Sequence, residues 1–434
     1  MLEKYFQLKK NKTNVRTEVI AGITTFMTMA YILAVNPDIL SATGMDKGAI
    51  FTATAISAAF GTLVMALWAK LPFALAPGMG LNAFFAFGVC LGMGMSWQFA
   101  LTAVFLEGIL FILMTVFNIR EVIINAIPKS IKNAISVGIG LFIAFIGMKN
   151  SGIIIAHDET FVHLGDMKSA GVLLALSGIA ITGALLALKV KGALLIGMVV
   201  TTLIGIPVGV TQLPHFDFSV PSVSSIAWKF DWSWVKTGEG IFTMITVLFT
   251  FLFVDMFDTV GTLIGVSTKA DMLTEDGRIP NVKKALMADS LGTTIGAVLG
   301  TSTVTTYVES AAGVAEGGRT GLTALTTAVL FIFALFLSPL FLMIPAAATA
   351  PALVLVGVMM MTPIQNLTFD DYTESIPAFF ALIMMPLTFS IAEGIVFGML
   401  SYVILKLFTG RYKEISIITY ILAILFVLKF VFMG

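Results

Sequence analysis

Long apolar stretches, separated by short polar turns, follow one another along almost the whole chain. Each is long enough to cross about 30 Å of hydrocarbon as a helix, so the pattern predicts an all-α polytopic membrane protein. The first half contains seven predicted spans: Val19 to Val35, Ile50 to Ala69, Ala74 to Leu91, Phe99 to Phe117, Ala134 to Gly147, Ala170 to Leu188 and Ala193 to Val210. The second half contains seven more: Ile241 to Val266, Ala285 to Leu299, Ser302 to Val314, Leu322 to Met343, Ala346 to Met361, Ile376 to Ile391 and Gly394 to Phe408. The stretch Ile415 to Met433 is left over. It is either a fifteenth span or a sign that fewer crossings lie between Ile376 and Phe408.

Composition supports the membrane interpretation. Of 434 residues, 58% are hydrophobic and 12% are charged, too few polar residues to cover a soluble globule. The net charge is zero and basic residues are scattered through short loops, which argues against a nucleic-acid surface. The single cysteine, Cys90, excludes an intrachain disulfide and a cysteine-based zinc site.

The positions of lysine and arginine predict the orientation. Basic residues cluster in a polar leader, residues 1–18, and in later loops that share its side of the membrane if each half has seven spans. The positive-inside rule then predicts a cytoplasmic N-terminus, and we expect a multi-pass protein of the cell membrane. Because seven is odd, the second half enters from the opposite side. We therefore predict inverted repeats, 19–210 and 241–408, joined by an interfacial linker, 211–240, and followed by a C-terminal hydrophobic segment, 409–434.

Both halves contain a backbone-breaking segment at a corresponding place. The first is LPFALAPGMGLNAFFAFG and the second is LGTSTVTTYVESAAGVAEGG. Non-helical backbone at membrane depth must be buried in protein or line a polar cavity, because its N–H and C=O groups need partners. Paired breaks in inverted halves are typical of transporters, where they mark the binding site. The plainer alternative is that Pro and Gly are common in membrane helices.

Two carboxylates, Asp255 and Asp258, lie in an apolar run from Ile241 to Ser267 that has no other charged residue. One acid at the bilayer centre costs roughly 2.5 to 3.5 kcal/mol, so two of them indicate a substrate or ion site. Residues three apart share a helix face, and two neighbouring acids in a low-dielectric site cannot both ionise cheaply. The pair is therefore suited to binding and releasing a proton. Sodium would use the same oxygens and remains an alternative.

Three segments, APGMGLNAFF, FLFVDMFDTVGTL and GTSTVTTYVESAAGVAEGGRTGL, resemble the AzgA-like hypoxanthine, adenine and guanine permeases of the nucleobase-cation symporter-2 superfamily. The resemblance extends from about Phe6 to Arg411. It implies about fourteen segments as seven plus seven inverted, with short extended stretches in segments 3 and 10. Segments 1 to 4 and 8 to 11 would form a core domain and the others a gate domain. Related permeases associate as dimers, but no interface for a homodimer is visible in the sequence.

The resemblance also implies the site residues Asn82, Asp255, Asp258 and Glu309. Uracil permeases carry a Glu and a nearby His on segment 8, so their pyrimidine recognition does not transfer to this chain. A carboxylate that accepts hydrogen bonds from adjacent ring N–H groups recognises the edge of a purine through strong, charge-assisted contacts. We assign that role to Glu309. We expect Asp255 to contact substrate or its proton, and Asp258 to tune it. Proton coupling would then involve all three acids.

Other groups could complete the site. Backbone N–H groups around Asn82 and Tyr307 could donate to ring nitrogens or a carbonyl, and Phe84, Phe85 or Phe257 could cover the flat face. With 36 phenylalanines in the chain, packing is the plainer role for any one of them. Two further acids have plainer interpretations too. Glu107 has two possible roles, as a member of a proton relay or as the acceptor of an interhelical hydrogen bond from a Ser or Thr. We expect Asp289 to have a structural role at the cytoplasmic edge.

The sequence thus predicts a secondary active transporter that imports purine nucleobases by cation symport, with protons preferred to sodium, through alternating access. It needs no cofactor or metal. The main alternative is a sulfate-permease-like anion transporter of the same architecture, but such a protein would want cationic or helix-dipole binding without acids at mid-membrane. A membrane enzyme is a more distant alternative, because the chain has no HExxH, Walker or dinucleotide-binding motif.

Overall fold

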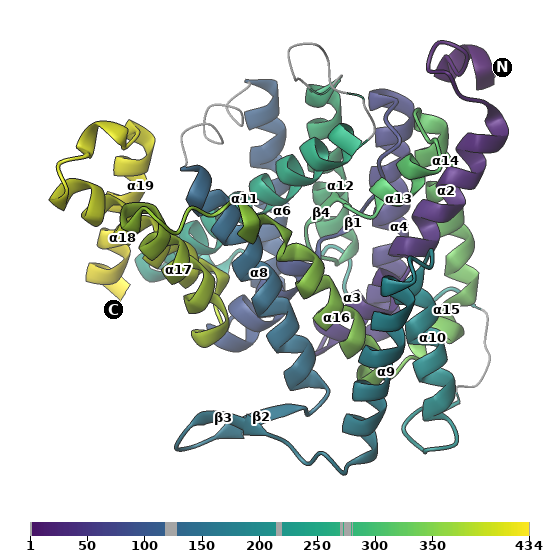
Figure 1. Ribbon diagram of the computed structural model, residues 1–434, viewed down its shortest axis with the longest axis horizontal. Coiled ribbons are helices and arrows are strands. Elements are labelled where there is room, and N and C mark those ends of the chain that lie inside the picture. Colours follow the sequence, from purple (N-terminus) through teal and green to yellow (C-terminus); the bar gives the residue numbers. More distant parts are fainter. Residues whose placement is uncertain are drawn as a thin grey trace.

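Helices lying side by side make up most of the protein in the computed structural model, which describes residues 2–117, 128–213, 219–269, 272, 279 and 281–433 (Figure 1). The elements of the first half are α1 (Leu2–Phe6), α2 (Val15–Met29), α3 (Ile32–Ser41), α4 (Lys47–Val64), the π-helical turn η1 (Met65–Ala69), β1 (Leu75–Pro77), α5 (Met79–Ala83), the π-helix η2 (Phe84–Gly92), α6 (Trp97–Val116), α8 (Lys129–Asn150), β2 (Ile154–His157), β3 (Phe161–Leu164), α9 (Ala170–Ala187) and α10 (Ala193–Gly205). Those of the second half are η3 (Ser233–Lys236), α11 (Gly238–Lys269), α12 (Val282–Leu299), β4 (Val304–Thr306), α13 (Ser310–Ala315), α14 (Gly321–Ala334), η4 (Leu335–Leu337), α15 (Ser338–Leu342), α16 (Ala346–Met360), η5 (Thr362–Asn366), α17 (Tyr372–Leu387), α18 (Ile391–Phe408), η6 (Tyr412–Glu414) and α19 (Ile417–Met433).

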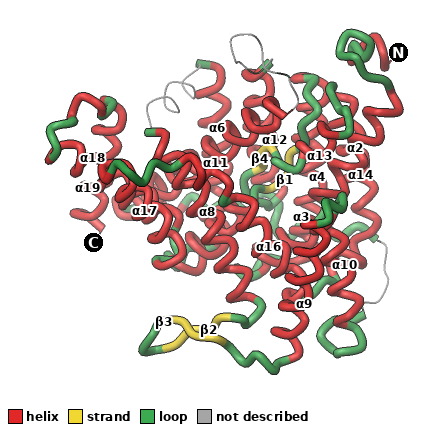
Figure 2. Tube along the Cα trace, viewed as in Figure 1, coloured by secondary structure: helices red, strands yellow, loops and turns green. Residues whose placement is uncertain are grey.

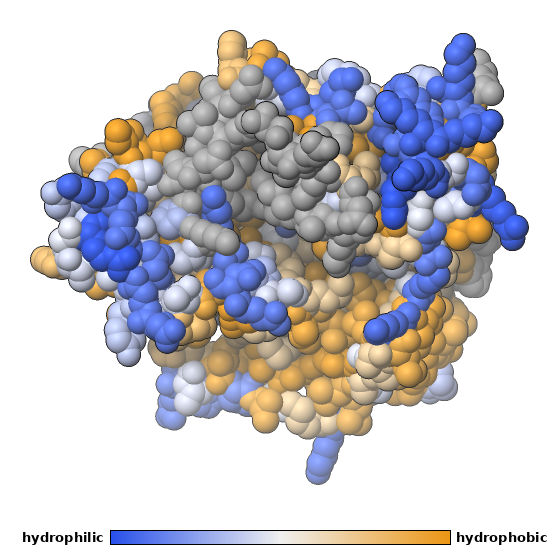
Figure 3. All heavy atoms as spheres, turned by 45° about the horizontal axis from the view of Figure 1, so that its top comes forward, coloured by the Kyte–Doolittle hydropathy of each residue, from blue (hydrophilic) through white to orange (hydrophobic). Residues whose placement is uncertain are grey.

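The predicted fold class is confirmed. Among the described residues, nine helical segments are long and apolar enough to cross a membrane, and α10 and α17 are shorter apolar helices. Segments 3 and 10 contain the predicted extended stretches, β1 and β4, which appear as the central yellow strands of Figure 2. On the face shown in Figure 3, hydrophobic residues cover much of the lower part, and hydrophilic residues gather at the upper right and on the left.

Two features differ from the predicted elements. The first span begins at Val15, inside the predicted leader, because Asn14 caps the helix by accepting from the Thr17 backbone N–H at 3.0 Å. A hairpin of β2 and β3, registered as Ile155 opposite His163, follows α8. The pattern of apolar residues did not predict it, because these strands are short and largely exposed, with Ile154 packed against the hydrophobic residues of α9.

The two broken segments meet at the centre of the protein. β1 and β4 pair antiparallel, with Ala76 opposite Thr305. The hydroxyl of Thr62, on α4, accepts from the Leu75 N–H at 2.9 Å and donates to the Leu75 carbonyl at 3.0 Å. In the second half, the Thr293 hydroxyl on α12 contacts the Val304 N–H and carbonyl at 3.2 and 2.9 Å. Matching threonines thus satisfy the backbone groups that the two breaks expose.

The helices pack as two units. The core unit contains α2 to α6 and α11 to α15, where α12 packs against α4 and α6, and α14 packs against α2 and α4. The gate unit contains α8 to α10 and α16 to α18, where α8 packs against α16 and α17, and α17 packs against α18. Contacts between the units are sparser, and the most extensive are those of α5 with α8, α2 with α10, and α3 with α16. The candidate site described below lies at the strand crossing of the core unit.

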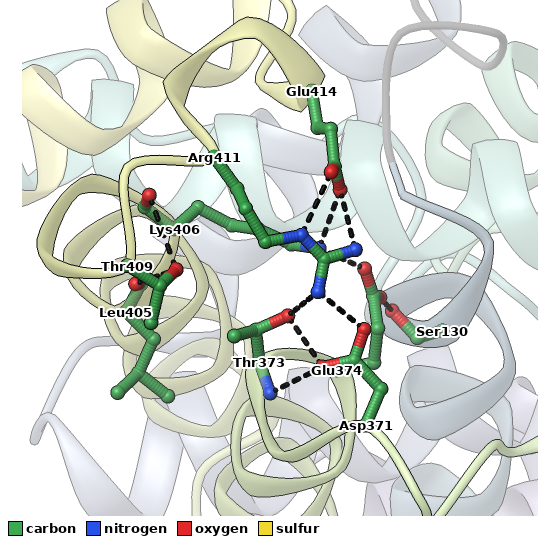
Figure 4. A network of polar contacts seen from close by, with 9 residues as sticks. All are labelled: Ser130, Asp371, Thr373, Glu374, Leu405, Lys406, Thr409, Arg411 and Glu414. Atoms are coloured by element: carbon green, nitrogen blue, oxygen red, sulfur yellow. Dashed lines mark hydrogen bonds and ion pairs between the residues drawn. The ribbon is translucent and has the colours of Figure 1, made fainter.

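An ion-pair network closes one end of the gate unit (Figure 4). Lys406 is wholly buried and pairs with Glu374 and Glu414, each at 2.7 Å. Arg411 bonds both Glu414 and Asp371. Hydrogen bonds from Arg411 and then from Lys406 lower the pKa of Glu414 to about 2. The network ties the start of α17 to the end of α18 and to η6.

Candidate functional site

Glu309 stands just beyond β4, where it precedes the first turn of the half-helix α13. Its carboxylate accepts a hydrogen bond from the Tyr31 hydroxyl at 2.6 Å, and both side chains are buried. Tyr31 occupies the short break between α2 and α3, which brings the first segment of the chain against the tenth. Sequence reasoning missed Tyr31, because a tyrosine in an apolar run has no local feature that identifies its partner.

Asp258, on α11, lies close to the strand crossing, next to the residue that follows β1. It is half-buried, and its Oδ2 is 3.7 Å from the position that a Cβ atom on Gly78 would take. Asp258 is within electrostatic range of Glu309 and of the phenols of Tyr31 and Tyr307. Two carboxylates and two phenols therefore gather beside the paired strands.

Asp255 lies deeper than Asp258 and is wholly buried. The hydroxyl of Thr259, one turn further along α11, donates to Asp255 Oδ1 at 3.0 Å and is 3.1 and 3.2 Å from the two carboxylate oxygens of Asp289. The same hydroxyl is 2.7 Å from the hydroxyl of Thr305 on β4. Because Thr259 has one hydroxyl hydrogen, it can donate to one of these oxygens at a time.

The position predicted for Asp289 was wrong. Instead of marking the edge of the membrane, its buried side chain joins the oxygen cluster around Thr259 and Thr305. Lys283 and Lys284 suggested an edge, but Asp289 lies well inside α12, which begins at Val282.

Asn82 and Tyr307 tie the two broken segments to each other. The Asn82 amide oxygen accepts from the Ser302 hydroxyl, and its amide nitrogen donates to the Pro77 carbonyl at 3.4 Å. Tyr307 donates its hydroxyl to the same Pro77 carbonyl at 2.5 Å and its backbone N–H to the Ala74 carbonyl at 2.9 Å. These contacts hold the crossing in place, beside the carboxylates.

The phenylalanines named from the sequence are packed in the core. Phe84 meets Phe251 of α11 edge to face, with ring centroids 4.8 Å apart, and Phe85 is wholly buried. The side chain of Phe257 lies outside the described residues. Of the two roles considered for Glu107, the structure contains the hydrogen bond, which the Thr303 hydroxyl donates at 2.6 Å. Among the described residues, no group of three or more His, Cys, Asp or Glu side chains is placed to hold a metal ion.

Comparison with known proteins confirms the family resemblance. Residues 16–397 match the Permease family. The chain is 46% identical over 432 residues to the adenine permease AdeP of Escherichia coli, covering 100% of this chain and 96% of that protein. It is 45% identical over 443 residues to the guanine/hypoxanthine permease PbuG of Bacillus subtilis, covering 100% of both.

Among solved structures, the transmembrane domain of the cyanobacterial bicarbonate transporter BicA is similar in fold, with a TM-score of 0.67 at 17% identity, covering 89% of this chain and 97% of that one. The relatives are named as transporters and not as enzymes. Three findings point to the same family. The architecture is helical and multi-pass, two broken segments cross as paired strands, and the family match covers most of the sequence. The chain belongs to the Permease family.

Proposed function

We propose that this chain is a secondary active transporter that imports purine nucleobases, namely hypoxanthine, guanine or adenine, by proton symport and alternating access. The observation that carries the proposal is the Glu309 carboxylate, held by Tyr31 next to the strand crossing and within range of Asp258. The names of the adenine and guanine/hypoxanthine permeases support the substrate class.

Purine recognition is assigned to Glu309 and Asp258. Ring N–H groups along a purine edge are donors, and a buried carboxylate is a strong, charge-assisted acceptor for them. Tyr31 occupies one oxygen of Glu309 and so fixes the direction of the other. Asn82, Phe84 and Tyr307 support the site by holding the broken backbone in place beside the base.

Proton coupling is assigned to Asp255 together with Asp258 and Glu309. Asp255 is the most deeply buried of the three, and Thr259 links it to Asp289. This burial favours a division of labour in which Asp255 carries the proton, one of the two roles predicted for it from sequence, and Asp258, predicted to tune Asp255, faces substrate. One proton crossing about 100 mV yields roughly 2.3 kcal/mol, enough for about a fifty-fold gradient of a neutral base.

The alternative, an anion transporter, draws on the fold shared with the bicarbonate transporter. The binding site for an anion would need positively charged side chains, or helix N-termini with no acid nearby. Asp255, Asp258 and Glu309 instead gather carboxylates at the crossing. These acids favour a neutral base with N–H donors.

The orientation and assembly remain as proposed from the sequence: a cytoplasmic N-terminus, the cell membrane as location, and inverted repeats 19–210 and 241–408. The antiparallel strands and the matching roles of Thr62 and Thr293 support the inversion. The homodimer expected from related permeases is part of the same proposal.

Uptake into proteoliposomes tests the function. Labelled hypoxanthine, guanine, adenine, uracil and bicarbonate are offered with proton and sodium gradients imposed separately. We expect purine accumulation driven by the proton gradient and abolished by Glu309→Gln. Purine uptake that ignores both gradients would exclude symport, and bicarbonate uptake in place of purine uptake would favour the alternative.

A further inference from the structure

We propose that the ion pair between Lys191 and Glu316 is a latch between the gate unit and the core unit, which opens and closes in each transport cycle. Lys191 Nζ lies 2.5 Å from Glu316 Oε1. Lys191 precedes α10 of the gate unit, and Glu316 follows α13 of the core unit. The latch rests on the proposed function, because it acts on the movement that carries the substrate.

The half-helix α13 connects this ion pair to the candidate site. Glu309 immediately precedes α13 and Glu316 immediately follows it, so one short helix carries both carboxylates. The Glu309 side chain bonds Tyr31 at one end, and the Glu316 side chain bonds Lys191 at the other. A movement of α13 relative to the gate unit would therefore change the contact with Lys191 while Glu309 stays on Tyr31.

Gly313 fixes α13 to the core unit. A Cβ atom at this position would come within 2.1 Å of the Thr25 hydroxyl and 2.5 Å of the Ala21 carbonyl, both on α2. Only a glycine allows this close approach between the two helices. Glu309, α13 and Glu316 thus move together with α2.

The other half of the latch is equally well placed. The loop before Lys191 is closed by backbone hydrogen bonds from Lys189 to Leu186 and from Val190 to Leu185, each 2.9 Å. Gly192 then lies against α2, since a Cβ atom there would be 3.2 Å from the Met27 carbonyl. Lys191 is therefore presented to the core unit by a loop that already touches it.

The pair has the strength expected of a reversible contact. The Lys191 side chain is 58% exposed and that of Glu316 is 23% exposed. An exposed pair of this kind changes an equilibrium by up to about fivefold, so it can bias two conformations without locking either. Both positions are accessible to a reagent, which makes the latch testable by cross-linking.

The experiment uses the single-cysteine character of the chain. Cys90→Ser removes the native thiol, and Lys191→Cys with Glu316→Cys introduces a pair for a short bifunctional methanethiosulfonate. In proteoliposomes, we expect cross-linking to abolish hypoxanthine uptake and reduction with dithiothreitol to restore it. Undiminished uptake by the cross-linked protein would overturn the latch.

A matched control is the pair Glu3→Cys with Lys9→Cys, taken from an ion pair that lies wholly before α2. Cross-linking there should leave uptake unchanged. The charge variants Lys191→Gln and Glu316→Gln should alter the uptake rate by up to about fivefold, and the exchange Lys191→Glu with Glu316→Lys should restore it. Purine binding should be unchanged in all of them. Absence of purine uptake by the wild-type protein would instead overturn the proposed function.

Discussion

Tyr31 donates its hydroxyl to Glu309 at 2.6 Å, although the two residues are 278 positions apart in the chain. The contact joins the break of the first segment to the end of β4. It fixes one oxygen of a buried carboxylate without neutralising it by a cation. A side chain held in this way is ready to accept from a ligand.

Tyr31→Phe should weaken purine binding. The ring remains to fill its site, but Glu309 loses a buried donor, which costs about 1 to 3 kcal/mol or about thirtyfold in affinity at the middle of that range. Equilibrium binding of labelled hypoxanthine to the purified protein measures the change. Tyr5→Phe is the control, because Tyr5 bonds the Leu67 carbonyl at an exposed place. Wild-type affinity in Tyr31→Phe would show that the contact has no part in binding.

Asp255→Asn and Asp258→Asn should fail in different ways. Asp255→Asn should abolish accumulation driven by a proton gradient while leaving exchange of hypoxanthine across the membrane, because exchange needs no net proton movement. Asp258→Asn should raise the KM for hypoxanthine in both assays. Comparing gradient-driven uptake with counterflow separates the two effects. The opposite outcome would contradict this division of labour.

Gly313→Ala should destabilise the protein and reduce uptake. The added methyl group meets the Thr25 hydroxyl and the Ala21 carbonyl, and such overpacking costs about 1 to 3 kcal/mol. Thermal unfolding in detergent and hypoxanthine uptake are the measurements. Gly183→Ala in α9 is the control, since nothing lies within 4 Å of its Cβ position. Equal behaviour of the two variants would argue against close packing of α13 on α2.

Acid should weaken the gate unit through Glu414 and Asp371. The pKa of Glu414 is lowered to about 2 and that of Asp371 is also lowered, in both cases first by hydrogen bonds from Arg411. Because these folded-state pKa values lie below the unfolded values of about 4, the stabilisation is present above pH 4 and is lost as pH falls toward 2.

Arg411→Gln should therefore unfold at a lower temperature than the wild type at pH 6, and the difference should shrink as pH approaches 2. Thermal unfolding across this range tests it. Lys413→Gln, at an exposed position of η6, should follow the wild-type curve. A difference that persists unchanged at pH 2 would mean that Arg411 stabilises by packing alone.

The parts of the site that could be predicted from sequence carry strong local signals. Asp255 and Asp258 interrupt a long apolar run, and Pro77 and Gly78 break a predicted span. The partners of these residues could not be predicted in the same way. Tyr31 resembles any aromatic of a membrane helix, and nearby lysines made Asp289 look peripheral. Which side chains meet depends on how the two halves of the chain cross. That crossing is set by packing between helices that are far apart in the sequence.

The strand crossing has a consequence for the origin of the protein. Each half supplies one extended strand, β1 or β4, and one threonine that serves it, Thr62 or Thr293. Under the inverted repeats proposed above, neither half contains both strands, so a seven-span ancestor would not satisfy this backbone as a monomer. It would have needed a second copy inserted upside down. Gene duplication would then have joined, within one chain, two partners that already depended on each other.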